Sequence, residues 1–218
     1  MGNIKLYMAP GSCTTAIHIL LEEIGEFFEA HVVNLPRGDH LKPEYTALNP
    51  KATIPTLVRR DGTALTETLA IAIWLARAYP KAGLWPEDLE SETRAIEMMG
   101  HITATTHGQG FARIFSAGAF AKSPNSEEAM LEIGRSIIAS SFGWLETVMA
   151  DQATDQGYAL GSYSVVDPIL FYVCFWASKT DIPMPDRLKA HFELMLSRPV
   201  VSRVLREEGY DPSRLKVA

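Results

Sequence analysis

Two short segments carry residue types that could bind an extended peptide. Pro55 follows a turn and leads into an apolar run, and a cis bond there would leave the backbone N–H and C=O of Ile54 free to pair with a ligand backbone. Further along, Glu67 and Thr68 open a helical pattern, where free N–H groups and the helix dipole attract a carboxylate. Glu67 could meet an ammonium while Thr68 meets the adjacent carboxylate. These groups predict a ligand with an amino-acid head and a peptide body.

The elements needed to position these residues fit one α/β layer. Hydrophobic patterns, capping residues and the turn signal Asp61-Gly62 predict strands at 4–8, 28–34, 56–59 and 63–66 and helices at 14–25 and 67–79. The order β-α-β, a loop, then β-β-α suits a thioredoxin-like domain over residues 1–80.

The remainder of the chain reads as helix after a turn-rich linker at 79–86. Helices are predicted at 88–115, 126–150, 165–179, 186–197 and 199–208. Ser164 and Asp167 form a capping box with Asp in the place of the usual Glu. The prediction is a second, all-α domain over residues 88–218.

Composition narrows the class of protein. The 218 residues carry 26 acidic and 20 basic side chains, a net charge of −6, which disfavours nucleic acid as a partner. Two cysteines without a C-x-x-C motif predict neither a metal site nor a disulfide framework. The chain opens directly on a strand, with no signal peptide and no apolar run of membrane-spanning length. The expected location is the cytoplasm, without membrane attachment.

Five short motifs carry a family resemblance: Pro10-Gly-Ser12, His40-Leu-Lys-Pro-Glu-Tyr45, Leu48-Asn-Pro50, Thr53-Ile-Pro-Thr-Leu57 and Leu65-Thr-Glu-Thr68. Together they resemble the N-terminal domain of glutathione transferases, most closely the serine-type delta and theta enzymes, with a second likeness to the bacterial beta class. The resemblance implies attack of the glutathione thiolate on a small hydrophobic electrophile, with glutathione as co-substrate and no cofactor. It also implies a two-fold homodimer with the γ-glutamyl site near the interface.

The same resemblance assigns the residues that hold glutathione: Thr53, Ile54, Pro55, Glu67, Thr68, His40 and Lys42. Ile54 would hold the tripeptide backbone, and Glu67 with Thr68 the γ-glutamyl end. His40 and Lys42 would reach the glycine carboxylate, although a solvated loop charge explains both residues equally well.

Three residues compete for activation of the thiol, which must ionise to act as a nucleophile. Ser12 could donate its hydroxyl proton to the thiolate, or could simply cap the first helix. Cys13, in the first helical turn, would have a depressed pKa and could form a mixed disulfide with glutathione. Tyr7 is better explained as a strand residue.

The helical half offers candidates for the electrophile side. His107 could hydrogen-bond a thiol or an incoming electrophile, and the glycines that follow it predict a weakened helix at a pocket wall. Met8, Phe111, Ile114 and Phe115 could line an apolar site, although such a stripe is more often core.

The chain also departs from the family pattern. Ala52 stands where relatives often carry a His or Lys that contacts glutathione, and Gly100 replaces a beta-class asparagine. Two alternative functions therefore stay open. One is a glutathione-dependent thiol–disulfide oxidoreductase that uses Cys13, and the other is a non-catalytic glutathione-binding or regulatory protein.

Overall fold

The computed structural model describes residues 2–123, 126–152 and 156–215, and they fall into two compact units. The first unit comprises Met1–Trp85 with Leu196–Ser213, and the second comprises Pro86–Met195 with Arg214–Ala218. The two domains predicted from the sequence, 1–80 and 88–218, stay a prediction. Residues 216–218 of the second predicted domain lie outside the residues that the structure describes. The segment Leu196–Ser213, near the C-terminus, groups with the first unit because its contacts are with that unit.

The first unit is built on a four-stranded mixed sheet with the order β2-β1-β3-β4. Strand β1 (Ile4–Met8) pairs in parallel with β2 (Phe28–Val32) and antiparallel with β3 (Thr56–Val58), and β3 pairs antiparallel with β4 (Ala64–Thr66). Alternate residues of β1 are fully buried, as a strand with one face on the core requires. This sheet places the ends of β1 and the start of β3 side by side.

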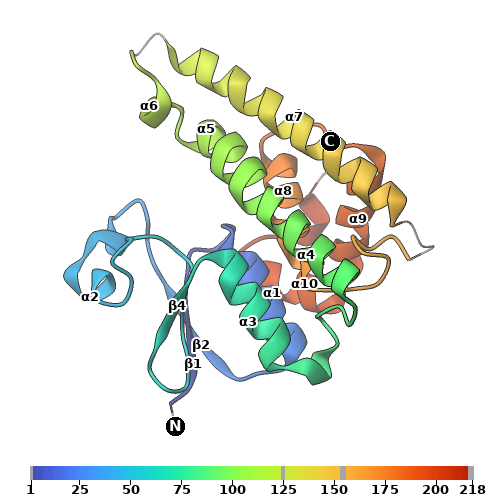
Figure 1. Cartoon of the computed structure of the whole chain (residues 1–218). Coiled ribbons are helices and arrows are strands. Elements are labelled where there is room, and N and C mark those ends of the chain that lie inside the picture. The colour runs from blue at the N-terminus through green and yellow to red at the C-terminus, as the bar shows by residue number, and fades with distance from the viewer. Residues whose placement is uncertain (1, 124–125, 153–155, 216–218) are drawn as a thin grey trace. The chain divides into compact units, whose positions relative to one another are not determined.

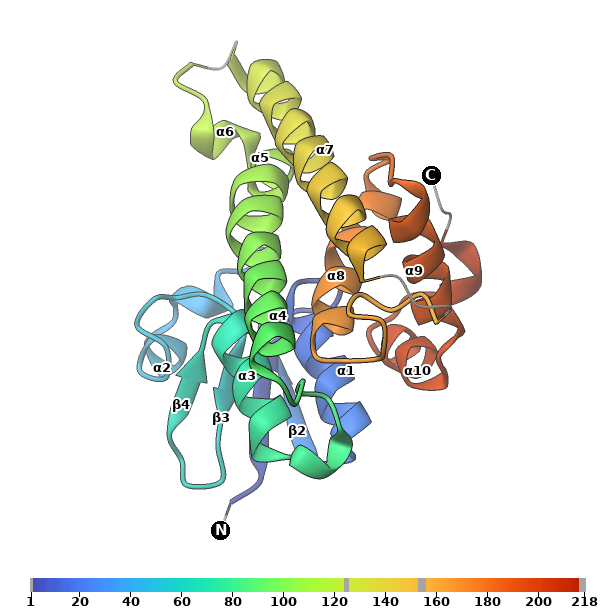
Figure 2. The same cartoon turned by 45° about the vertical axis from the view of Figure 1, so that its right-hand side comes forward.

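Helices complete the first unit: α1 (Thr14–Ile24), α2 (Pro43–Thr46), α3 (Thr68–Ala78), α10 (Pro199–Glu207) and the 3-10 turns η1 (Asp39–Leu41), η2 (Pro80–Ala82) and η5 (Pro212–Arg214), the last of which reaches past Ser213. Helix α1 packs against both α3 and α10, and α1 and α3 lie side by side in both views (Figure 1, Figure 2). The first eight residues of α1 are buried, so its N-terminus is held firmly at the end of β1.

The second unit is helical: α4 (Leu89–His101), the π-helix η3 (Ile102–Phe111), α5 (Ala112–Phe115), α6 (Ala117–Phe120), α7 (Glu127–Asp151), α8 (Val166–Lys179) and α9 (Asp186–Ser197), which reaches past Met195. The run from η3 to α5 packs along α7 (Figure 1). Helix α8 is buried from Val166 to Ala177 and forms the core of this unit. No helix in the described residues is long and apolar enough to cross a membrane.

The helix predicted at 88–115 is continuous, but ten of its residues form a π-helix. Gly110 lets this helix approach α7 closely, because a Cβ there would lie 2.5 Å from the Ile138 side chain. The predicted opening of this helix near His107 is confirmed. The turn α6 was not predicted, because its small residues carry no helical pattern.

The capping box before α8 forms with one change. The Asp167 carboxylate accepts a hydrogen bond from the backbone N–H of Ser164 at 2.7 Å, as predicted. The Ser164 hydroxyl, however, accepts from the N–H of Val166 at 3.3 Å and not from that of Asp167. Asp167 also accepts from the N–H of Ala159 at 2.9 Å and from Nε2 of His191 at 3.0 Å, so it joins three segments of the second unit.

Candidate functional site

Ser12 lies in the turn between β1 and α1, and its hydroxyl already has local partners. Its Oγ accepts a hydrogen bond from the backbone N–H of Thr14 at 3.1 Å and lies 2.8 Å from the Thr14 hydroxyl. Because the Thr14 hydroxyl donates to the carbonyl of Ala9 at 2.9 Å, the Ser12 proton is the one available between the two hydroxyls. The Ser12 hydroxyl therefore accepts from the Thr14 N–H and donates its proton to the Thr14 hydroxyl, so it must turn away from Thr14 to donate to a thiolate.

Cys13 is buried, with 5% of its surface exposed, and its Sγ lies 3.8 Å from the carbonyl oxygen of Ile54. Burial raises the pKa of the Cys13 thiol to about 11, although hydrogen bonds with the Thr68 and Ser12 hydroxyls lower it in part. The expected depressed pKa is therefore wrong, because loss of hydration outweighs the helix end. The contact of Sγ with Ile54 places the turn that carries Ser12 beside the cis-proline loop.

The loop before β3 presents the backbone of Ile54. The Ile54–Pro55 bond is cis, as its sequence context suggested. The carbonyl of Thr53 accepts hydrogen bonds from the Tyr45 hydroxyl at 2.6 Å and from Nδ2 of Asn49 at 2.7 Å, which fixes the loop. Among the described residues nothing accepts a hydrogen bond from the Ile54 N–H. That N–H is available to a ligand backbone.

Glu67 and Thr68 stand at the N-terminus of α3, where they were predicted. Glu67 has a positive φ of 74°, unusual for a residue other than glycine and common at functional sites. Its carboxylate pairs with the Lys51 ammonium at 2.5 Å, and both side chains are largely exposed. Thr68 is 8% exposed, so its side chain is buried at the start of α3. A carboxylate that pairs with one ammonium here can pair with another.

His40 and Lys42 differ in what they can offer an anion. Lys42 forms an ion pair with Asp39 at 2.6 Å, and the hydrogen bond to Asp39 raises the pKa of Lys42. Its charge is therefore already matched. His40 is half-buried, and no described residue hydrogen-bonds its buried Nδ1 atom. Of these two side chains, only that of His40 has a polar atom, Nδ1, without a hydrogen-bond partner among the described residues.

His107 lies in the π-helix η3 and belongs to an aromatic cluster of the second unit. The Tyr172 hydroxyl lies 3.3 Å from Nδ1 of His107. The ring of Trp176 packs edge to face against the imidazole, with 4.8 Å between the ring centroids. Burial lowers the pKa of His107, so the neutral imidazole is favoured at pH 7. Phe115, 54% exposed, packs against Phe111 and Trp176.

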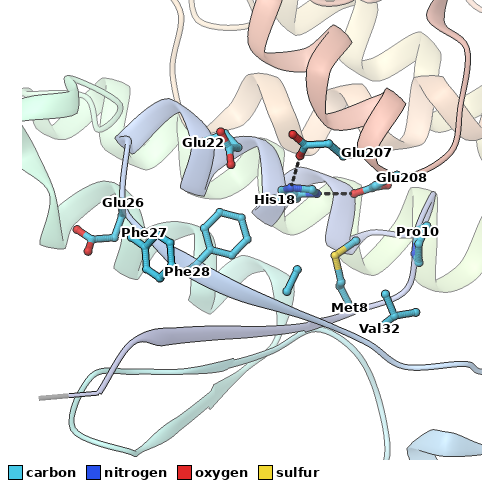
Figure 3. A pocket seen from close by; sticks show the side chains of 11 residues that line it. Met8, Pro10, His18, Glu22, Glu26, Phe27, Phe28, Val32, Glu207 and Glu208 are labelled. Atoms are coloured by element: carbon cyan, nitrogen blue, oxygen red, sulfur yellow. Dashed lines mark hydrogen bonds and ion pairs between the residues drawn. The ribbon is translucent and has the colours of Figure 1, made fainter.

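The remaining apolar candidates lie in different surroundings. Phe111 is fully buried and Ile114 is half-buried, so Phe115 is the most accessible of the three in this part of the second unit. Met8 belongs to the first unit, is 2% exposed and lines a cavity of about 350 Å³ with His18 and Phe28 (Figure 3).

A group of potential metal ligands adjoins that cavity. Atoms of His18, Glu22 and Glu207 lie within 4.8 Å of one another. The Arg203 guanidinium pairs with both carboxylates, so a cation of the protein already offsets part of their charge. We therefore do not assign a metal site to these three side chains.

Several residues of this region carry no readable signal in the sequence. Tyr45 and Asn49 lie within the recognised motifs, but only the structure gives their bracing contacts to Thr53. Trp176 belongs to an apolar helix that the sequence predicts as core. Glu208, which accepts a hydrogen bond from the Gly11 N–H at 2.7 Å, lies near the other end of the chain, so no local pattern links the two.

Comparison with known proteins agrees with this geometry. The family model described as "Glutathione S-transferase, N-terminal domain" matches residues 11–78. The chain is 30% identical over 214 residues to glutathione S-transferase GstA of Escherichia coli O157:H7, covering 94% of this chain and 99% of that protein. It is 32% identical over 160 residues to glutathione S-transferase D7 of Drosophila melanogaster, covering 70% of this chain and 66% of that protein.

Solved structures extend the likeness over the whole chain. A glutathione transferase homolog from Sulfitobacter with bound glutathione has a TM-score of 0.83 at 28% identity, covering 96% of this chain and 99% of that one. The beta-class enzyme of Sphingomonas chungbukensis has a TM-score of 0.78 at 28% identity, covering 94% and 98%. These matches, with the thioredoxin-like layer and the helical unit, show that the chain belongs to the glutathione S-transferase family and is a glutathione transferase.

Proposed function

We propose that the first unit binds glutathione along the cis-proline loop and that Ser12 stabilises its thiolate for attack on a small hydrophobic electrophile. The observation that carries this assignment is that the turn of Ser12 lies beside the cis-proline loop, where Cys13 Sγ is 3.8 Å from the Ile54 carbonyl and no described residue accepts from the Ile54 N–H. A hydroxyl that hydrogen-bonds to sulfur lowers the pKa of a thiol by favouring its charged form. The adjacent N-terminus of α1 favours negative charge in the same way.

The two ends of glutathione are assigned to different charges. Glu67 binds the γ-glutamyl ammonium in place of Lys51, and Thr68 with the N-terminus of α3 binds the adjacent carboxylate. His40 binds the glycine carboxylate in preference to Lys42, because the charge of Lys42 is already paired with Asp39. The Ile54 backbone pairs with the cysteinyl backbone of the tripeptide, as an added strand would. Thr53 and Pro55 fix the conformation of that loop.

The electrophile is assigned to the aromatic cluster of the second unit. Phe115 offers an exposed ring, and the neutral imidazole of His107 offers a hydrogen bond. Phe111 and Ile114 support this surface, while the burial of Met8 in the first unit makes it the weakest member of the proposed set. No cofactor is needed for thiolate attack, and glutathione is the co-substrate.

The assembly and location are also proposals. A homodimer is supported by the exposed apolar residues Leu89 and Ile96, which lie on one face of α4 two helical turns apart. A reducing cytoplasm suits the two cysteines, Cys13 and Cys174, both buried and unpaired.

The assignment is tested by conjugation of glutathione to a generic aryl halide with wild type, Ser12→Ala and Cys13→Ala side by side. Loss of kcat in Ser12→Ala alone supports the serine mechanism. Loss in Cys13→Ala alone transfers the role to the cysteine and calls for a disulfide-reduction assay. Saturable glutathione binding without turnover of any electrophile would support a binding protein instead.

A further inference from the structure

The carboxylate of Glu208, directly after α10, collects three hydrogen bonds from the start of the first unit. Its Oε2 accepts from the backbone N–H of Gly11 at 2.7 Å and from the Thr15 hydroxyl at 2.7 Å. Its Oε1 lies 2.9 Å from Nδ1 of His18 (Figure 3). The side chain is 1% exposed. A buried carboxylate is costly unless its oxygens accept hydrogen bonds, and these three donors supply them.

All three donors surround the turn that carries Ser12. Gly11 immediately precedes it, and the Thr15 N–H donates to the Ser12 carbonyl at 3.0 Å. His18 lies one turn further along α1. These hydrogen bonds therefore hold the Gly11–Ser12 turn in a fixed position relative to the start of α1. The position of this turn then sets the direction of the Ser12 hydroxyl.

A second contact from the same C-terminal segment closes on Gly11. Gly11 has a φ of +72°, and a Cβ built on it would lie 2.0 Å from the hydroxyl oxygen of Tyr210. Only glycine allows this approach without displacing Tyr210. Glu208 thus binds the N–H of Gly11 while Tyr210 packs against its Cα.

We propose that Glu208 is a positioning residue for the transferase reaction, which holds the Gly11–Ser12 turn in the geometry that activates the glutathione thiol. Glu208 has no role in binding substrate. It acts through Gly11 and Thr15, and the proposal rests on the function assigned above to Ser12.

Substitutions at this position separate positioning from packing. Glu208→Ala leaves the Gly11 N–H, the Thr15 hydroxyl and His18 Nδ1 without their acceptor. Glu208→Gln keeps an acceptor oxygen for Gly11, and its amide can donate to Nδ1 of the other imidazole tautomer, whose Nε2–H then faces Glu207 at 3.3 Å. Glu208→Asp keeps the charge but shortens the reach by one methylene.

Arg198→Ala is the matched control. Arg198 pairs with Glu23 at 2.8 Å and so also links the C-terminal segment to α1, but at the end of this helix opposite to Ser12. A loss of activity that comes only from a loosened C-terminal segment would appear in both variants.

The experiment combines amide hydrogen exchange over residues 11–14 with steady-state kinetics. In Glu208→Ala we expect exchange to rise and kcat to fall, each roughly tenfold, while KM for glutathione stays within about twofold, because misplacement of a catalytic group costs rate more than binding. Glu208→Gln should keep most of the wild-type kcat, and Arg198→Ala should change neither quantity. If Glu208→Ala does not fold, Glu208→Asp must show the same split between kcat and KM.

Wild-type exchange and kcat in folded Glu208→Ala would overturn the proposal. So would an equal loss of kcat in Arg198→Ala, no rescue by Glu208→Gln, or a fall in kcat that accompanies an equal rise in KM. If wild type conjugates no electrophile, the function proposed for Ser12 fails, while the exchange measurement still decides whether Glu208 fixes the turn.

Discussion

Asp167 offers a stringent test of how the second unit is held together, through the change Asp167→Ala. The carboxylate is completely buried and accepts from the N–H groups of Ala159 and Ser164, the Ser164 hydroxyl and Nε2 of His191. Hydrogen bonds to a charged group contribute about 1.5–3 kcal/mol each and are not additive. Leaving a buried donor without its acceptor costs about 1–3 kcal/mol. Because several buried donors lose their acceptor together, we expect Asp167→Ala to lower the free energy of unfolding by about 3 kcal/mol.

The measurement is reversible urea unfolding followed by circular dichroism and tryptophan fluorescence. Asp167→Asn, which keeps the volume and one acceptor oxygen, should lose less than the alanine variant. Glu132→Ala, at an exposed position of α7, should change the free energy by no more than about 0.5 kcal/mol. A loss below about 1 kcal/mol in Asp167→Ala would refute the reasoning, because the orphaned donors would then have found other partners.

Three further predictions concern the site. Burial lowers the pKa of His107 below its usual 6.5, so the unfolded chain takes up that proton before the folded chain does as the pH falls. The free energy of unfolding should therefore be constant above pH 6.5 and decrease below it. Urea unfolding at several pH values should show a smaller decrease in His107→Gln. The Cys13 pKa of about 11, against an ordinary 9.0, lowers its thiolate fraction at pH 8 roughly 100-fold. Iodoacetamide should therefore alkylate Cys13 slowly in the folded protein, as followed by mass spectrometry. Rapid labelling would contradict the buried position of this thiol. Glu67→Gln should raise KM for glutathione roughly tenfold, the size of one charge-assisted contact, and an unchanged KM in initial-rate kinetics would remove Glu67 from the γ-glutamyl site.

The sequence allowed the strands, the main helices and the cis-proline loop to be predicted, because each has a local cause. Strand 4–8 and helix 186–197 have the predicted bounds, since periodicity and turn residues mark both ends. The residues recognised around Ile54 and Glu67 occupy the expected elements for the same reason.

Contacts between distant segments could not be predicted in this way. Burial of the Cys13 sulfur reverses the expected direction of its pKa, and no local pattern encodes that burial. The pairing of Lys51 with Glu67 and of Glu208 with Gly11 likewise depends on tertiary packing. The π-helix around His107 was indicated only indirectly, by the glycines at 108 and 110.

The most direct test of the account is the pKa of the glutathione thiol when bound, followed through the ultraviolet absorption of the thiolate in a pH titration. The account predicts that wild type lowers this pKa well below that of free glutathione and that Ser12→Ala returns it most of the way, while Cys13→Ala leaves it low. A low pKa in Ser12→Ala together with a restored pKa in Cys13→Ala would contradict the role assigned to Ser12.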